Sequence, residues 1–385
     1  MRAAVSALFF MNGLTVGGWA PQVPELAARH GLSESQMGLM ILALGIGSIL
    51  IMPLSGALIA RIGARPVLRV TCLLCSAALL PVVLAPDAAS LAVVMFCFGG
   101  VIGSMDIAMN ANAVVVERRL GRAIMSSCHG FWSLGGLFGA ALGGWLIQIA
   151  GSVEQAMAVT AAAFLIAVIS LRHIAADLPL APESKPKFRL TLQPMPYVLG
   201  LVALFSMVPE GAVLDWRALY LRQDLGADAA TSGLAFGAVA ATMAVMRFAG
   251  DTVRERLGAV TTVRCSTVVA AAGLIVAAGA QSPAWAIAGF ALSGIGIANL
   301  VPVALSAAGN LPGLPPGVGI SIATSMGYCG ILLGPALIGF VAEHNSFSVA
   351  FYGLSALFGV VLVLSAVTRH ADLGRETVAV RTLAE

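Results

Sequence analysis

When the ends of the long apolar stretches of this 385-residue chain are set aside, four ionisable side chains remain inside them: Asp106, His129, Glu210 and Asp215. A charged group in hydrocarbon costs roughly 3 kcal/mol or more, so each is expected to face a cavity or a partner. A buried carboxyl can bind a proton, because burial disfavours its charged form. Asp106 and Glu210 are therefore predicted to carry protons. The alternative for each is a structural carboxylate that ties neighbouring helices together.

Amide and aromatic side chains accompany these acids. At about 1.5 Å of helix per residue, Asp106, Glu210 and Asn299 fall at similar depths near the membrane midplane, where a site open to both sides in turn has to lie. Such a set suits a hydrogen-bonding solute such as a sugar. The residues predicted to bind the solute are Asn12, Trp19, Asn110, His129, Trp132, Asp215, Trp216, Asn299 and Tyr328.

Several of these residues also have plainer interpretations. His129 could be a hydrogen-bonded core histidine, Asp215 could pair with Arg217 at the surface, and each aromatic ring could be packing or an interfacial anchor. Histidine and cysteine do not cluster as metal ligands, so we expect no metal site. The chain has no nucleotide-binding motif and no assembled nucleophile, so we expect no cofactor and no enzymatic activity.

Composition indicates which elements position these residues. The chain is 59% hydrophobic and 10% charged, whereas a soluble protein has about a quarter of its residues charged. Apolar stretches of about 20 residues cross a bilayer as helices. We therefore expect an all-α membrane protein with twelve transmembrane helices, near 3–27, 36–60, 66–86, 90–116, 123–149, 153–172, 196–221, 229–253, 260–280, 283–309, 316–342 and 346–368.

The basic residues predict the orientation of these helices. With both termini cytoplasmic, all of the 21 Lys and Arg residues except Arg29, Arg217 and Arg222 lie inside, as the positive-inside rule requires. The net charge of +3 thus reflects membrane orientation. It gives no support to a nucleic-acid partner.

The chain repeats itself. A shift of 195 residues places Gly31, Gly38, Gly63, Gly99, Gly135, Gly139 and Gly144 on Gly226, Gly233, Gly258, Gly294, Gly330, Gly334 and Gly339. Two like halves in a membrane chain predict a transporter, because repeated halves let a central site face either side in turn. We expect six-helix bundles at 1–173 and 195–369, a cytoplasmic linker at 174–194 and a cytoplasmic tail at 370–385.

Two segments at the same offset resemble a known family. The segment from Gly56 to Pro66, GALIARIGARP, resembles the loop signature of the major facilitator superfamily, and RFAGDTVRERLG from Arg247 occupies the equivalent place. The resemblance assigns a gating role at the cytoplasmic side to Gly56, Arg61, Gly63, Arg65, Arg247, Gly250, Asp251, Arg256 and Gly258. The signature's acid is replaced by Ala60. We therefore expect Asp251, which can pair with Arg247 four residues earlier, to carry more of this role.

Finer features resemble the bacterial YbjJ-like group and, more loosely, fucose-permease-like proton symporters. They are SCHGFWSLG from Ser127, Glu210-Gly211, Asp215-Trp216 and Asn110. The resemblance implies a monomer in a bacterial inner membrane. The predicted function is secondary active transport of a small organic solute by alternating access, with protons coupled and symport favoured. The alternatives are a proton-antiporting exporter of drugs or metabolites, and a membrane sensor that moves nothing.

Overall fold

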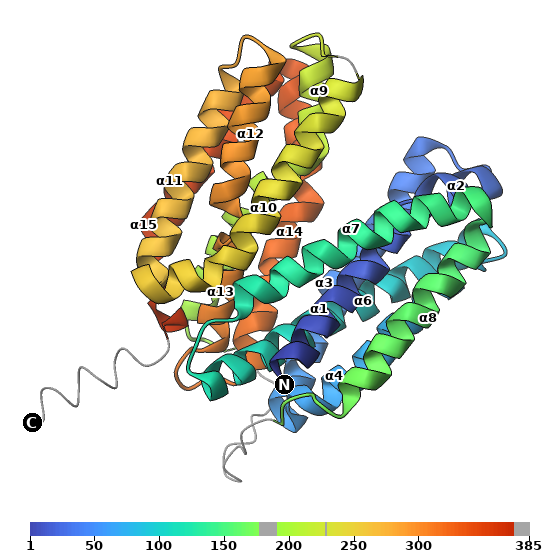
Figure 1. Cartoon of the computed structure of the whole chain (residues 1–385), viewed down its shortest axis with the longest axis vertical. Coiled ribbons are helices and arrows are strands. Elements are labelled where there is room, and N and C mark those ends of the chain that lie inside the picture. The colour runs from blue at the N-terminus through green and yellow to red at the C-terminus, as the bar shows by residue number, and fades with distance from the viewer. Residues whose placement is uncertain (177–190, 228, 373–385) are drawn as a thin grey trace, which may run out of the picture. The chain divides into compact units, whose positions relative to one another are not determined.

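The computed structural model describes residues 1–176, 191–227 and 229–372, and these residues form helices with no strand (Figure 1). The predicted linker and tail lie mostly outside these ranges. The first half contains α1 (Arg2–Trp19), α2 (Gln22–His30), α3 (Glu34–Ile62), α4 (Ala64–Ala77), α5 (Leu79–Val83), α6 (Ala88–Leu120), α7 (Met125–Ile149) and α8 (Ser152–Leu171). The second half contains α9 (Met195–Gln223), α10 (Ala229–Leu257), α11 (Ala259–Ala278), α12 (Pro283–Ile297), α13 (Leu300–Gly309), α14 (Pro316–His344), α15 (Phe347–Leu364) and the 3-10 helix η2 (Ser365–Ala371).

The helices have the length and composition of membrane spans. Within the described ranges, 11 helical segments are long and apolar enough to cross a bilayer. The remaining predicted stretch, 229–253, forms α10, whose second half carries several charged residues. Large apolar side chains face outward on many helices: Leu50 is 56% exposed, Leu165 60% and Val245 71%. The expectation of an all-α, multi-pass membrane protein with twelve spans is confirmed.

Three of the predicted spans are broken helices. The first consists of α1 and α2, the third of α4 and α5, and the tenth of α12 and α13. Prolines stand at or just after these breaks, at Pro21, Pro81 and Pro302. A proline has no N–H to donate and its ring clashes with the carbonyl four residues earlier. Pro302 therefore leaves the carbonyl of Ala298 without its helical partner, which matters for the site described below.

The chain divides into two compact units. The first comprises Met1–Leu120, Ser127–Leu192 and Gly313–Ser321, and the second comprises Gly121–Ser126, Gln193–Pro312 and Ile322–Glu385. In the first unit α3 packs along α6 and α1 along α8, and in the second α11 packs along α12 and α15. The domain boundaries expected from the repeat stay a prediction.

Equivalent glycines adopt equivalent conformations in the two halves. Gly63 ends α3 and begins α4 at φ 89°, and Gly258 ends α10 and begins α11 at φ 82°. Residues with a Cβ are strained in this region of φ, whereas glycine is not. The sequence repeat thus corresponds to a repeated backbone corner between two helices.

Glycines also let α1 and α7 approach closely (Figure 1). A Cβ added at Gly13 would lie 2.0 Å from the carbonyl oxygen of Trp132, and one at Gly135 would lie 2.0 Å from that of Phe10. Small residues at such contacts allow backbone-to-backbone packing, on which helix association in lipid depends. These two helices carry several of the predicted site residues, so this contact helps to position the site.

We predict that Gly135→Ala destabilises the protein, because the new methyl group meets backbone that cannot move aside. Overpacking of this kind costs about 1–3 kcal/mol. Gly144→Ala is the matched control on the same helix, since an added Cβ there meets nothing within 4 Å. Thermal unfolding in detergent should show a lower Tm for Gly135→Ala alone. Equal Tm values for the two variants would contradict this account of the α1–α7 contact.

A second prediction concerns Asp87, which stands directly before α6. Its Oδ1 accepts a hydrogen bond from the backbone N–H of Ser90 at 2.8 Å, and this bond, with the Ser90 side chain, lowers the pKa of Asp87. A lowered pKa in the folded state adds stability above the ordinary pKa of about 3.9 and loses it as pH falls through the folded value. The Tm of the wild type should therefore fall more than that of Asp87→Asn below about pH 4. If the Tm values of the wild type and Asp87→Asn fall in parallel as pH is lowered, the charged Asp87 side chain does not stabilise the start of α6.

Candidate functional site

The first unit contains a hydrogen-bonded chain from α6 to α7. Asp106 lies near the middle of α6 and is 8% exposed. The side-chain amide of Asn110 donates to Oδ1 of Asp106 at 3.3 Å and to the backbone carbonyl of Asp106 at 2.8 Å. The Oδ1 of Asn110 lies 3.2 Å from Nε2 of His129. Three predicted site residues are therefore in contact, and Asn110 links the carboxyl to the imidazole.

Asn12 and Trp132 form a second contact in the same unit. The indole N–H of Trp132 on α7 donates to Oδ1 of Asn12 on α1 at 2.8 Å. The ring of Phe9, one turn before Asn12, meets the His129 ring edge-on at a centroid distance of 5.3 Å. Trp132 shares α7 with His129, and Asn12 shares α1 with Phe9, which contacts His129. The Asn12–Trp132 contact therefore lies beside the Asp106–Asn110–His129 chain.

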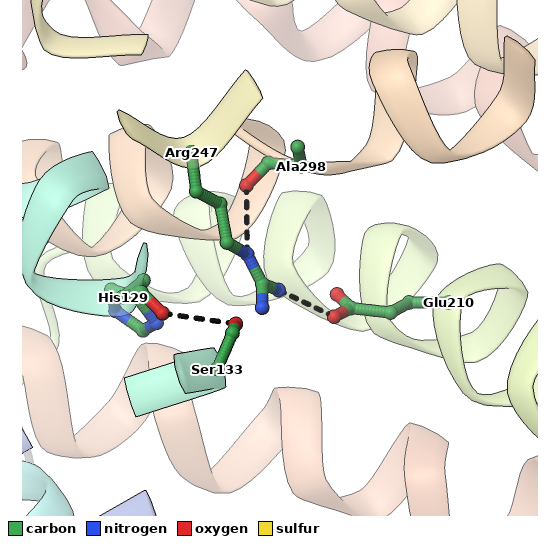
Figure 2. A network of polar contacts seen from close by, with 5 residues as sticks. All are labelled: His129, Ser133, Glu210, Arg247 and Ala298. Carbon is green, nitrogen blue, oxygen red and sulfur yellow. Dashed lines mark hydrogen bonds and ion pairs between the residues drawn. The ribbon is translucent and has the colours of Figure 1, made fainter. Parts of the chain in front are cut away.

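A buried ion pair lies in the second unit. Nη2 of Arg247 on α10 lies 2.6 Å from Oε1 of Glu210 on α9, and their side chains are 8% and 17% exposed. The Nε of Arg247 donates to the backbone carbonyl of Ala298 at 3.4 Å. Figure 2 shows the guanidinium held between that carbonyl and the carboxylate. Separately, in the first unit, the Ser133 hydroxyl on α7 donates to the carbonyl of His129 at 3.1 Å (Figure 2).

The Ala298 carbonyl is available because of the break between α12 and α13. Residue 302 would donate to it in a continuous helix, but Pro302 has no N–H. A buried carbonyl without a partner is costly, and the Nε–H of Arg247 supplies one. The proline on one helix therefore prepares an acceptor for the arginine on another.

Asn299 lies at the same break. Its side chain is 1% exposed, and its amide donates to the carbonyl of Met246 at 3.1 Å. A Cβ added at Gly250 would lie 2.0 Å from its Oδ1. Gly250, expected to act in gating, thus allows Asn299 to approach α10 one turn beyond Arg247.

Two of the other predicted binding residues make aromatic contacts. Trp19 packs against Phe98 at a centroid distance of 6.1 Å, and Trp216 packs against Phe347 at 5.7 Å. Tyr328 is half-buried on α14. The side chain of Asp215 lies outside the described part of the structure.

The predicted gating residues occupy helix ends and buried positions. Asp251 is 6% exposed, and its Oδ1 accepts from the backbone N–H of Ser126 at 2.9 Å. Gly56 lets α3 approach Ser321 within the first unit. Arg61 and Arg256 are exposed and Arg65 is half-buried. Their role in gating, and the pairing of Arg247 with Asp251, stay predictions.

The partnership of Arg247 with Glu210 was not foreseen from the sequence. Arg247 begins the second-half signature and was expected at the cytoplasmic side, although its place well inside α10 could have indicated a buried charge that needs a partner. No group of three His, Cys, Asp or Glu residues that could hold a metal ion occurs within the described ranges.

Buried polar groups on apolar helices, in a chain of two repeated halves, define a membrane transporter. The Major Facilitator Superfamily model matches residues 5–218 and again 199–380, and the chain belongs to this superfamily. An uncharacterised MFS-type transporter of Yersinia pestis is 36% identical over 360 residues, which are 93% of each chain. The uncharacterised transporter y4wD of Sinorhizobium fredii is 30% identical over 379 residues, 95% of this chain and 97% of its own length.

A solved structure shares the fold. The Escherichia coli fucose:proton symporter superimposes with a TM-score of 0.77 at 15% sequence identity, over 95% of this chain and 98% of that one. At this identity the likeness concerns the fold. The expected membership of the superfamily and its twelve-helix architecture are confirmed.

We predict that the Arg247–Glu210 pair is strongly coupled. Removing one partner of a buried pair leaves an uncompensated charge and costs about 3–5 kcal/mol. Glu210→Gln and Arg247→Gln should each lower stability, and the double variant should lose much less than the two losses added together. Chemical unfolding of the four proteins in detergent measures this coupling. Additive losses would show that the two side chains do not depend on one another.

Proposed function

We propose that this protein is a secondary active transporter that moves a small polar organic solute by alternating access together with protons. Symport is the favoured mode, and a sugar-like or other hydrogen-bonding solute fits the amide and indole groups near Asp106. Asp106 and Glu210 carry the protons. The leading candidates for contact with the solute are the polar side chains of the contacts described above: Asn12, Asn110, His129, Trp132 and Asn299.

The environment of Asp106 carries this proposal. Its carboxyl is buried near the middle of a membrane-spanning helix and is hydrogen-bonded to an amide, with no cationic partner among the described residues. Desolvation disfavours a carboxylate that lacks a counter-charge, and a proton removes that penalty. A buried acid in a membrane span is expensive to keep, so its presence favours a role in the transport cycle.

Glu210 complements Asp106 because it has a charged partner. A carboxylate paired with an arginine can give up that partner when it is protonated. Protonation of Glu210 would therefore change a contact between α9 and α10, whereas protonation of Asp106 would remove a charge. The fold shared with a fucose:proton symporter is compatible with this coupling.

The rival proposal is export by proton antiport. Both modes use buried acids, so residues alone do not separate them. We further propose that the protein is a monomer in the bacterial plasma membrane, with both termini cytoplasmic. The distribution of Lys and Arg supports this orientation.

Proton movement driven by solute tests the proposal. The purified protein is reconstituted in liposomes that enclose a pH-sensitive dye, and pools of sugars, polyols and organic acids are added outside. Symport predicts that at least one pool acidifies the lumen, whereas antiport predicts that an active pool makes it alkaline. Asp106→Asn should remove most of the proton signal, because the side-chain amide cannot bind and release a proton as a carboxyl group does.

Glu25→Gln is the control, because Glu25 is an exposed acid of the same unit on α2. It should retain the wild-type proton signal. Solute entry without any pH change in the wild type, or an unchanged proton signal in Asp106→Asn, would contradict the assignment of Asp106.

A further inference from the structure

We propose that Arg247 binds the carboxylate group of the transported solute, and that this carboxylate takes the place of Glu210 when Glu210 is protonated. The substrate class is then small organic carboxylates. This inference rests on the proposed function, because it names the solute that shares a site with the proton on Glu210.

The geometry of the pair supplies the first step. A guanidinium stays protonated in proteins, so the positive charge on Arg247 is permanent. One Nη atom lies 2.6 Å from the Glu210 carboxylate, and Nε is engaged by the carbonyl of Ala298 at 3.4 Å. The guanidinium is thus fixed by backbone on one side and by a removable charge on the other. The 17% exposure of the Glu210 side chain gives a proton access to that removable charge.

The cost of an unpaired buried charge supplies the second step. If Glu210 becomes neutral while Arg247 stays charged, the buried cation loses the counter-charge that stabilised it. An anion that reaches the guanidinium removes this penalty. The position vacated is that of a carboxylate, whose two oxygens match the fork of guanidinium N–H groups. A carboxylate solute therefore restores the original interaction, which an uncharged sugar does not.

The charged groups near Arg247 on the surrounding helices have contacts of their own. On the same face of α10, Asp251 and Arg254 follow Arg247 by one and two turns. An oxygen of Asp251 is already engaged by the backbone N–H of Ser126 at 2.9 Å. On α9 Arg247 contacts Glu210, and α12 and α13 carry no ionisable side chain. The basic residue of α11, Arg264, donates to the Ser365 hydroxyl at 3.0 Å.

Proton and carboxylate binding are then thermodynamically linked. Each raises the affinity for the other by the same factor, as linkage requires. Together they add no net charge to the pair. A weakly bound carboxylate should therefore bind more tightly as pH falls, and a variant that mimics protonated Glu210 should bind it without any proton.

Acetate and acetamide are suitable probes, because they have the same shape and differ in charge. Binding is measured on the purified full-length protein in detergent, by the rise in Tm at constant ionic strength. Acetate should bind Glu210→Gln at least about tenfold more tightly than it binds the wild type at about pH 8, within the usual range of coupling between sites. In the wild type its affinity should rise between about pH 8 and about pH 6. Acetamide should have no effect on either protein.

Two further variants make the test specific. The double variant Glu210→Gln with Arg247→Gln should not respond to acetate, because the guanidinium is absent. Arg222→Gln should behave as the wild type, since Arg222 is an exposed arginine on α9. If Glu210→Gln does not fold, the test is the pH dependence of acetate affinity in the wild type. The proposal predicts that this dependence is lost in Arg247→Gln.

The proposal is overturned if acetate and acetamide act alike on Glu210→Gln, or if acetate still binds the double variant. It is also overturned if acetate affinity in the wild type is independent of pH. Because this is equilibrium binding without a gradient, it does not depend on Asp106. A failure of proton-coupled transport in liposomes and a failure of carboxylate binding are therefore separate results.

Discussion

A permanently charged guanidinium buried among apolar helices needs a counter-charge, and this requirement organises the second unit of the protein. The side chain of Arg247 is 8% exposed and holds Glu210 of α9 to α10. Pro302 breaks the tenth span and so leaves the carbonyl of Ala298 for the same guanidinium. Gly250 lets Asn299 approach α10 one turn further on. Charged side chains such as those of Arg247 and Glu210 are costly in a membrane helix, and here they form one polar centre with Asn299 and the Ala298 carbonyl.

The first unit handles its buried acid differently. Asp106 is hydrogen-bonded to an amide, and Asn110 continues the contact to His129. The two repeats thus share backbone corners at Gly63 and Gly258 but carry different chemistry on their polar helices. One half holds a carboxyl that a proton can neutralise, and the other holds a carboxylate that a proton can release from its arginine. In the proposed mechanism, one protonation removes a charge and another frees a binding group.

Much of the fold follows from the sequence, because apolar length and glycine spacing are local signals. Long apolar runs predicted the spans, and the repeat predicted that Gly63 and Gly258 occupy equivalent places. The broken spans could have been expected from Pro21, Pro81 and Pro302. For the site, Asp106 and Asn110 are four residues apart on one helix, a spacing that places two side chains on the same face. The Arg247–Glu210 pair could not be derived in the same way, because it depends on how α9 and α10 pack. Asn12 with Trp132 is likewise a contact between helices far apart in the sequence.

The proposed alternating-access transport requires that water reach the acids on α6 and α9 from each side of the membrane in turn. The most direct measurement is labelling of Asp106→Cys and Glu210→Cys, in a chain whose native cysteines are replaced, with a membrane-impermeant thiol reagent. It is applied to right-side-out and to inside-out vesicles. Leu50→Cys, on the outward face of α3, is the lipid-facing reference. The account predicts that both acid positions react in both kinds of vesicle while the Leu50 position does not. The account would be contradicted if the cysteines at positions 106 and 210, like the one at position 50, reacted only with a lipid-soluble maleimide.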